Sequence, residues 1–281
     1  MTGKTRCVAI LGHPISHSKS PQMHQAAFEA LKLDFAYLPF DIEPRKLESA
    51  VNALKTLGFS GFNVTVPFKE KIIPLLDVVA PDARIIGAVN TVLIKDNKLT
   101  GFNTDGKGFI RSVQKAWKIR LAGKKIVIIG AGGSSKAIAV SLCMEKAVSI
   151  GILNRTLSKG RNLSDHLARL FRRPEIFSLP LYGNDTRDAI AQADLLINTT
   201  SLGLNPKDPS PLPSGYIRPG MKVYDLIYNP AETRFLKEAK KTGCQVLNGS
   251  SMLLCQGALA FEIWTGKMPP LAVMAQAIDI P

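Results

Sequence analysis

The stretch Lys125–Lys136 reads KIVIIGAGGSSK, in which an apolar segment runs straight into a turn rich in glycine. A pattern typical of a helix follows, up to Met144. Strand, glycine turn and helix in this order are the context that a dinucleotide-binding fingerprint requires. Gly130 permits the tight turn, Gly132 lets the backbone come close to a pyrophosphate, and the helix N-terminus offers free N–H groups. The strict pattern has a third glycine where Ser135 stands, so the match fails at one position.

The end of the next predicted strand indicates which dinucleotide is bound. That strand, 148–153, leads into Asn154, Arg155 and Thr156. An NAD enzyme usually has Asp or Glu here to hold the ribose 2′-hydroxyl, whereas the Arg155 guanidinium can grip a 2′-phosphate and stack on adenine. Lys159 adds positive charge if a helix begins at Thr156. The sequence therefore favours NADP over NAD. The candidate cofactor-binding residues of the two segments are Gly130, Ala131, Gly132, Gly133, Ser134, Asn154, Arg155, Thr156 and Lys159.

Around these segments, two blocks of sequence alternate between strand-like and helix-like patterns. The strands expected in the first block are 6–11, 35–40, 61–66, 88–94 and 99–102. The helices expected there begin at an N-cap on Ser20 and cover 44–57 and 104–117, and a hairpin turn is expected at 96–97. The strands expected in the second block are 125–129, 148–153, 195–199, 222–226 and 245–247. Strands separated by helices predict an α/β fold with mostly parallel sheets.

The two blocks predict two domains. Residues 1–105 are expected to form an N-terminal α/β substrate-binding domain with a mostly parallel sheet, and 106–249 a Rossmann-like NADP-binding domain. The apolar helical segments 251–264 and 271–278 have no strand of their own to pack on. We therefore expect residues 250–281 to return to the first domain and complete it.

Composition narrows the class of protein. The chain has 281 residues, 46% of them hydrophobic, which is ordinary for a globular enzyme. A net charge of +14 attracts anions, but the basic residues are spread along the chain and form no recognised nucleic-acid motif. The four cysteines are far apart, the histidines have no metal-ligand spacing, and there is no signal-peptide or membrane-span pattern. We expect a cytoplasmic protein that needs no metal and binds neither nucleic acid nor membrane.

The first block carries polar residues that suggest a small acidic substrate. Ser18 and Ser20 stand at the mouth of a predicted helix, where hydroxyls and free N–H groups suit a carboxylate. Simple capping by Ser20 is the alternative, but it would leave Ser18 unexplained.

Four more polar residues lie where predicted strands end or a helix begins. Thr65 and Lys69 follow the strand 61–66, at the sheet edge where ligands of α/β proteins bind. Asn90 interrupts an apolar strand, and Asp105 lies in the first turn of the helix that joins the domains. Each of them alone could be a cap or a surface polar group.

Together these segments resemble the shikimate dehydrogenase family. The matching pieces occur in the family's order and span nearly the whole chain; they are 12–21, 63–69, 87–91, 103–106, 130–133, 154–156 and 256–258. The resemblance implies reversible NADP-linked reduction of 3-dehydroshikimate to shikimate, in chorismate and aromatic amino-acid biosynthesis, by an oxidoreductase that acts on a CH–OH group.

The resemblance also implies roles for individual residues. Lys69 is expected to be the general acid and base, with Asp105 as its partner. Tyr228 is expected on the substrate side of the NADP domain, and Leu226 and Gly249 at the nicotinamide half. The full set of implied substrate-binding residues is Ser18, Ser20, Thr65, Lys69, Asn90, Asp105, Tyr228 and Gln256. The chain departs from the family at Gln25, where many members have Asn, and at 134–136, which continues the glycine turn as Ser-Ser-Lys.

Other readings of the sequence stay open at this point. A quinate/shikimate dehydrogenase would accept quinate and often NAD, although Arg155 argues against NAD. A non-catalytic NADP-binding regulator would be expected to lack Lys69 and Asp105, and both are present. The expected partners are small molecules, and the resemblance permits either a monomer or a homodimer.

Overall fold

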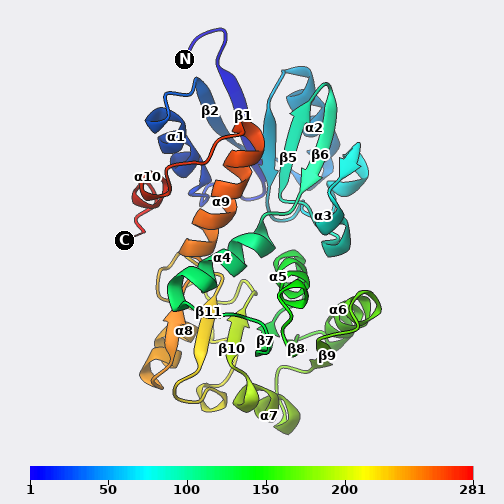
Figure 1. Cartoon of the computed structure of the whole chain (residues 1–281), viewed down its shortest axis with the longest axis vertical. Coiled ribbons are helices and arrows are strands. Elements are labelled where there is room, and N and C mark those ends of the chain that lie inside the picture. Colours follow the sequence, from blue (N-terminus) through cyan, green and yellow to red (C-terminus); the bar gives the residue numbers. More distant parts are fainter. Residues whose placement is uncertain (281) are drawn as a thin grey trace. The chain divides into compact units, whose positions relative to one another are not determined.

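The computed structural model describes residues 1–280 and divides the chain into two compact units. Unit 1 consists of Met1–Phe109 and Leu253–Pro281, and unit 2 is Ile110–Met252 (Figure 1). Helices α4 (Asp105–Trp117) and α9 (Ser250–Thr265) each contain a point of division. Each unit contains a six-stranded sheet, and the two are described separately below.

Unit 1 is built on a mixed sheet of strand order β2-β1-β3-β5-β6-β4. Strand β1 pairs in parallel with β2 and β3, β3, β5 and β6 are antiparallel neighbours, and β4 pairs in parallel with β6. The strands are β1 (Arg6–Gly12), β2 (Phe35–Asp41), β3 (Gly61–Val64), β4 (Val78–Val79), β5 (Thr91–Lys95) and β6 (Lys98–Phe102). The helices are α1 (Ser20–Ala30), α2 (Leu47–Thr56), α3 (Pro81–Ile86) and α10 (Leu271–Gln276), with the parts of α4 and α9 named above and 3₁₀ turns at Pro44–Lys46 and Ile73–Leu75.

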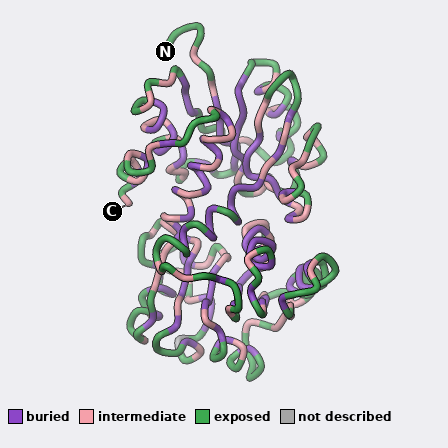
Figure 2. Tube along the Cα trace, in the orientation of Figure 1, coloured by how far each residue is buried: buried purple, intermediate pink, exposed green. Residues whose placement is uncertain are grey.

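The period-two pattern of β1 places apolar side chains on both faces of this sheet. Val8 and Ile10 enter a core formed with α1, α9 and α10, whereas Ala9 and Leu11 enter a second core formed with α2 and β3. Helix α9 is therefore the element that brings the C-terminal segment into the first core (Figure 1). Both faces of β1 are therefore covered, and the tube is coloured as buried along most of this strand (Figure 2).

Unit 2 is built on a fully parallel sheet of strand order β12-β11-β10-β7-β8-β9. Its strands are β7 (Lys125–Ile129), β8 (Ser149–Leu153), β9 (Glu175–Leu179), β10 (Leu195–Asn198), β11 (Lys222–Asp225) and β12 (Gln245–Leu247). Its helices are α5 (Gly133–Met144), α6 (Leu157–Leu170), α7 (Asn184–Gln192) and α8 (Arg234–Lys241), with a 3₁₀ turn at Ser214–Tyr216. Buried side chains of α7 and α8 pack with those of β7, β10 and β11 in one core. This is the Rossmann-like arrangement that the α/β pattern predicted.

Several predicted boundaries are wrong by a few residues. Ser20 is the first residue of α1 and not its N-cap, because Lys19 already has near-helical backbone angles and occupies the cap position. The third strand ends at Val64 and not at Val66, where Pro67 has no N–H to continue a ladder. The fourth predicted strand begins only at Thr91. Residues 44–46 form a 3₁₀ turn before α2 begins. Among residues 1–280, no helix combines the length and the apolar character needed to cross a bilayer.

Candidate active site

Lys69 and Asp105 meet in unit 1. Lys69 lies in the segment that follows β3, Asp105 is the first residue of α4, and the Lys69 Nζ is 2.6 Å from the Asp105 Oδ2. The two side chains are only 17% and 6% exposed. Thirty-six positions of sequence thus separate an ammonium and a carboxylate that form a largely buried ion pair. Such a pair is a candidate for proton transfer, because strong interactions with buried charges are typical of functional sites.

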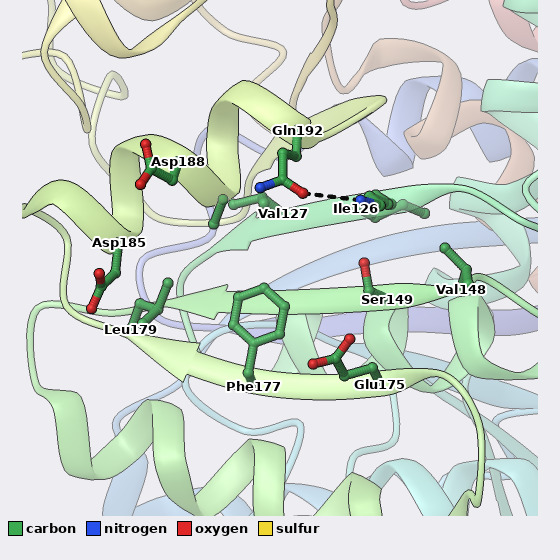
Figure 3. A pocket seen from close by; sticks show the side chains of 12 residues that line it. Ile126, Val127, Val148, Ser149, Glu175, Phe177, Leu179, Asp185, Asp188 and Gln192 are labelled. Carbon is green, nitrogen blue, oxygen red and sulfur yellow. Dashed lines mark hydrogen bonds between the residues drawn. The ribbon is translucent and has the colours of Figure 1, made fainter.

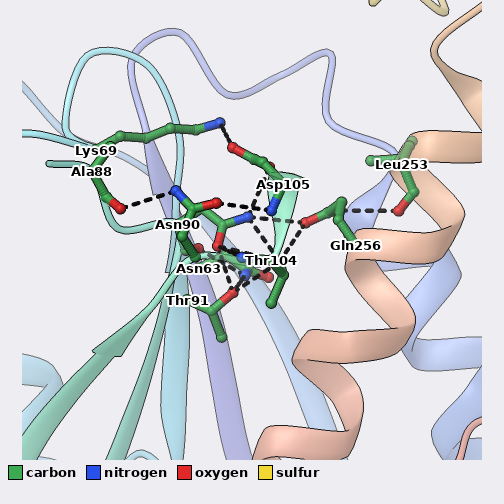
Figure 4. Close-up of polar contacts among 10 residues, drawn as sticks. Asn63, Lys69, Ala88, Asn90, Thr91, Thr104, Asp105, Leu253 and Gln256 are labelled. Carbon is green, nitrogen blue, oxygen red and sulfur yellow. Dashed lines mark hydrogen bonds and ion pairs between the residues drawn. The ribbon is translucent and has the colours of Figure 1, made fainter. Parts of the chain in front are cut away.

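The second carboxylate oxygen of Asp105 is held by Asn90. The Asn90 Nδ2 donates to the Asp105 Oδ1 at 2.8 Å, and the backbone N–H of Asp105 donates to the Asn103 Oδ1 at 3.0 Å. Gln256, which comes from α9, accepts from the Asn90 Nδ2 at 3.3 Å through its Oε1 (Figure 4). Four of the predicted site residues therefore belong to one hydrogen-bonded group, Asp105 and Gln256 from helices and Lys69 and Asn90 from connecting segments.

Besides Asn103, three more buried residues of this group were not among the predicted site residues. The Thr104 N–H donates to the Asn90 Oδ1 at 2.8 Å, and the Thr91 Oγ1 donates to the same oxygen at 3.0 Å. Asn63 donates through Nδ2 to the Asn90 carbonyl and to the Thr91 Oγ1. All three lay inside segments that carry the family resemblance, and Asn63 gave a further signal as a polar residue in an apolar strand. Thr91 gave no such signal, because Thr is common in strands.

Ser18 and Ser20 lie together at the start of α1. The Ser20 N–H donates to the Ser18 Oγ at 3.3 Å, and the Ser20 side chain hydrogen-bonds to Tyr37. Burial raises the pKa of the Tyr37 hydroxyl, so this group stays protonated and donates to the Asn63 Oδ1 at 2.7 Å. Ser18 is half-buried, whereas Ser20 is buried. Hydrogen bonds thus connect the two serines with the group around Asn90.

Thr65 is the remaining predicted residue of this region. It directly follows β3, is half-buried, and donates its backbone N–H to the Leu11 carbonyl at 2.9 Å. A Cβ at Gly12 would lie 2.6 Å from the Thr65 Cγ2, so the glycine leaves the space in which the Thr65 side chain sits. Thr65 therefore lies at the carboxyl edge of the unit 1 sheet, where the α/β rule places ligands.

In unit 2, the glycine turn has the geometry that a pyrophosphate needs. Gly130 has φ +113°, a conformation that L side chains rarely adopt, and a Cβ there would lie 2.5 Å from the Thr199 Oγ1. An ideal Cβ on Gly132 meets no heavy atom within 4 Å, so open space lies in front of this residue. Ser135 is fully buried, and its Oγ accepts the Gly132 N–H at 3.1 Å. The turn and the N-terminus of α5 therefore fit a dinucleotide phosphate.

The segment after β8 presents free positive charge. Thr156 is the N-cap of α6, Asn154 Nδ2 donates to the Thr156 carbonyl at 2.8 Å, and Arg155 and Lys159 are exposed. Neither cation has an ion-pair partner among residues 1–280. Both are thus available to an anion, and no carboxylate stands near Arg155 in sequence to repel a 2′-phosphate.

The predicted nicotinamide residues follow the last two strands of unit 2, Leu226 directly after β11 and Gly249 after β12. A Cβ at Gly249 would overlap the carbonyl oxygen of Leu226, which explains glycine at this position. The Gly249 N–H donates to the Ile227 carbonyl at 3.1 Å, and Tyr228 is half-buried. Asp225 is the last residue of β11, and burial raises its pKa to about 6. Hydrogen bonds from Thr233 and two other donors lower the pKa and so offset part of this rise.

Unit 2 also has an open pocket that contains none of these residues. It runs along β7, β8 and β9 beneath α7 (Figure 3). Most of its strand residues, such as Lys125, Ser149 and Glu175, stand at the amino ends of the strands. Ligands of such sheets bind at the carboxyl ends, so the pocket does not mark the cofactor site.

Comparisons with known proteins point to one family along the whole chain. Residues 10–92 match the shikimate dehydrogenase substrate binding domain, 112–204 match shikimate/quinate 5-dehydrogenase, and 249–278 match the shikimate 5′-dehydrogenase C-terminal domain. The shikimate dehydrogenase (NADP(+)) of Moorella thermoacetica is 48% identical over 276 residues, which cover 98% of this chain and 92% of that protein.

Two solved structures extend the comparison to the fold. Shikimate 5-dehydrogenase from Thermus thermophilus, in complex with NADP(H) and shikimate, superposes with a TM-score of 0.87 at 38% identity and covers 98% of each chain. Quinate dehydrogenase from Corynebacterium glutamicum, in complex with NAD, superposes with a TM-score of 0.89 at 29% identity, again with 98% of each chain. The overall fold is thus shared by relatives that differ in substrate and cofactor.

Proposed function

The chain belongs to the shikimate dehydrogenase family, and from this premise we propose that Lys69 and Asp105 are the catalytic pair of an NADP-dependent oxidoreductase. The reaction is the reversible reduction of 3-dehydroshikimate to shikimate, a step in aromatic amino-acid biosynthesis. The observation that carries the role of the pair is the 2.6 Å contact between the Lys69 Nζ and the Asp105 Oδ2 in a mostly buried setting.

Lys69 handles the proton. When bound, NADPH would supply the hydride for the carbonyl carbon, and NADP⁺ would accept it in the reverse direction. The Lys69 ammonium stabilises the negative charge that develops on the carbonyl oxygen and donates a proton to it. In the oxidation direction, the amine accepts the hydroxyl proton. Asp105 orients the Nζ through Oδ2, while Asn90 fixes its other oxygen.

The substrate is held by the polar residues of unit 1. Ser18 and Ser20, with the N-terminus of α1, bind the carboxylate. Thr65, Asn90 and Gln256 hydrogen-bond the ring hydroxyls, and Tyr228 contributes from unit 2. We assign the substrate domain, expected over 1–105 and 250–281, to unit 1 (Met1–Phe109 and Leu253–Pro281), and the NADP domain, expected over 106–249, to unit 2 (Ile110–Met252).

NADP is held by the segments after β7 and β8 and by the residues that follow β11 and β12. The backbone of residues 130–134 binds the pyrophosphate at the N-terminus of α5. Arg155 and Lys159, with Asn154 and Thr156, bind the adenosine 2′-phosphate. Leu226 and Gly249 contact the nicotinamide half. We place this enzyme in the cytoplasm, as a monomer or homodimer.

The test is NADPH formation from shikimate by the purified chain, with quinate and NAD in parallel arms, for wild type and Lys69→Ala. We expect wild type to prefer shikimate and NADP. Lys69→Ala should lose most of kcat while KM for shikimate changes little, because the ammonium acts chiefly on the transition state. An unchanged kcat in Lys69→Ala would refute the catalytic pair, and a preference for quinate or NAD would refute the substrate or cofactor assignment.

A further inference from the structure

Thr91 lies behind the catalytic pair and is fully buried. It is the first residue of β5, and its side chain points into the hydrogen-bonded group around Asn90 (Figure 4). Its Oγ1 lies 3.0 Å from the Asn63 Nδ2 and 3.0 Å from the Asn90 Oδ1. With no exposed surface, Thr91 contacts neither solvent nor an incoming ligand, so any effect it has on the reaction must pass through a neighbour.

The direction of the hydrogen bonds follows from the partner at the far end. The protonated Tyr37 hydroxyl donates to the Asn63 Oδ1, which identifies that atom as the amide oxygen. The Asn63 Nδ2 therefore donates its two protons to the Asn90 carbonyl and the Thr91 Oγ1. Thr91 already accepts there, and of the two oxygens that its single proton can reach, the Asn90 Oδ1 at 3.0 Å is closer than the Thr104 Oγ1 at 3.4 Å, so the proton goes to the Asn90 Oδ1.

This proton, together with the Thr104 N–H, fixes the orientation of the Asn90 amide. The Asn90 Oδ1 accepts from Thr91 and from the Thr104 N–H, so its Nδ2 must face the Asp105 Oδ1 at 2.8 Å. Asp105 is then left with Oδ2 for the Lys69 ammonium. We propose that Thr91 is a positioning residue, which acts through Asn90 to hold Asp105 in register with Lys69. This inference rests on the proposed catalytic role of Lys69.

The first experiment compares Thr91→Val with Thr91→Ser. Valine has the same shape but no hydroxyl, so Asn90 loses a donor and Asn63 loses an acceptor. A lost buried hydrogen bond corresponds to a fall in kcat of about tenfold, and KM for NADP should stay unchanged. Thr91→Ser keeps the hydroxyl and should restore kcat to within about threefold of wild type. Where Thr91→Val does not fold, Thr91→Cys replaces it, and its weak S–H donor should give a kcat below that of Thr91→Ser.

Thr186→Val is the matched control. Thr186 is also fully buried, lies on α7 of unit 2, and donates one hydrogen bond, to the Pro180 carbonyl at 2.8 Å. We expect it to lower the unfolding temperature about as much as Thr91→Val does and to leave kcat unchanged. An equal fall of kcat in both variants would show that the loss reflects general destabilisation and would overturn the proposal.

A double-mutant cycle with Asn90→Ala tests the route of the effect. If Thr91 acts through Asn90, Thr91→Val should change kcat by less than about twofold in the Asn90→Ala background. Multiplying effects would overturn the proposal. Lys69→Ala, assayed alongside, separates the two claims. Retention of kcat in Lys69→Ala refutes the catalytic pair itself, whereas its loss together with a normal kcat in Thr91→Val refutes only the role of Thr91.

Discussion

The candidate sites of the two units are built in opposite ways. In unit 1, the polar side chains are buried, come from distant segments and bind one another, as the contacts of Asn90 with Asp105 and Gln256 illustrate. In unit 2, the cofactor segments are short and continuous in sequence, and Arg155 and Lys159 stand exposed without an ion-pair partner among residues 1–280. Proton transfer needs a fixed geometry, whereas holding a phosphate needs open backbone and available charge. Substitutions in unit 1 should therefore act mainly on kcat, and those in unit 2 on KM for NADP.

The largest effect is expected for Asp105→Asn. Asparagine keeps the shape of the side chain, but it removes the charge that holds the Lys69 ammonium at 2.6 Å. A misplaced acid–base group typically lowers the rate by about 10²- to 10³-fold, and we expect kcat to fall by about that factor. KM for NADP should stay within about twofold of wild type, since no cofactor residue is touched. Steady-state kinetics in both directions measures this, and a change confined to KM for NADP would erase the contrast between the units.

The same contrast between the two units explains which regions the sequence predicts. The strand Lys125–Ile129 and its glycine turn are a local pattern, and the strand has the predicted bounds. In contrast, α6, β9 and α7 were not predicted as elements, because the apolar residues of 157–192 are interspersed with charged ones and with Pro174, Pro180 and Gly183, so no long apolar period stands out. The meeting of Lys69 with Asp105 depends on how β3 and α4 are placed in the fold, and no spacing in the sequence encodes it. Only the family resemblance anticipated it.

The next prediction concerns His24, in the core beneath the two serines. His24 stacks on Tyr37 with ring centroids 4.6 Å apart, and neither ring nitrogen has a hydrogen-bond partner within residues 1–280. Burial lowers its pKa from 6.5 to about 3. Below pH 6.5 the unfolded chain takes up a proton that the folded chain refuses, so stability falls as pH decreases, until the folded pKa is reached. The loss is about 1.4 kcal/mol per pH unit, or about 3 kcal/mol at pH ~4.5.

His24→Phe should remove this acid sensitivity. Phenylalanine keeps the stacking on Tyr37 and has no group to protonate. We expect the difference between the free energies of unfolding at about pH 7 and about pH 4.5, measured with urea, to shrink by about 3 kcal/mol. His166→Phe, at an exposed position on α6, serves as the control and should keep the wild-type difference. If His24→Phe loses as much stability between about pH 7 and about pH 4.5 as wild type does, groups other than His24 cause the acid sensitivity.

A smaller effect is expected at the exposed cations of unit 2. Arg155→Gln removes the paired, charged N–H donors for the 2′-phosphate, and charge-assisted bonds of this kind correspond to roughly a tenfold to hundredfold rise in KM for NADP. The KM for NAD, which has no 2′-phosphate, should change little. Lys159 lies in the first turn of α6, and Lys159→Gln should show the same selectivity with a weaker effect. Equal losses with NADP and NAD would mean that Arg155 does not read the 2′-phosphate.

The smallest effect is expected in the glycine turn, where Gly132→Ala and Gly130→Ala distinguish a loss of NADP binding from a loss of stability. Gly132 has φ −89°, which alanine adopts without strain, and its missing Cβ would meet no protein atom. Gly132→Ala should therefore keep or slightly raise the unfolding temperature, yet increase KM for NADP about fivefold by obstructing the pyrophosphate. Gly130→Ala forces a Cβ into the left-handed region and against Thr199, so it should lower the unfolding temperature as well. A normal KM for NADP in Gly132→Ala would show that the pyrophosphate does not lie in the open space at Gly132. The cofactor site of unit 2 would then have to lie elsewhere on the unit.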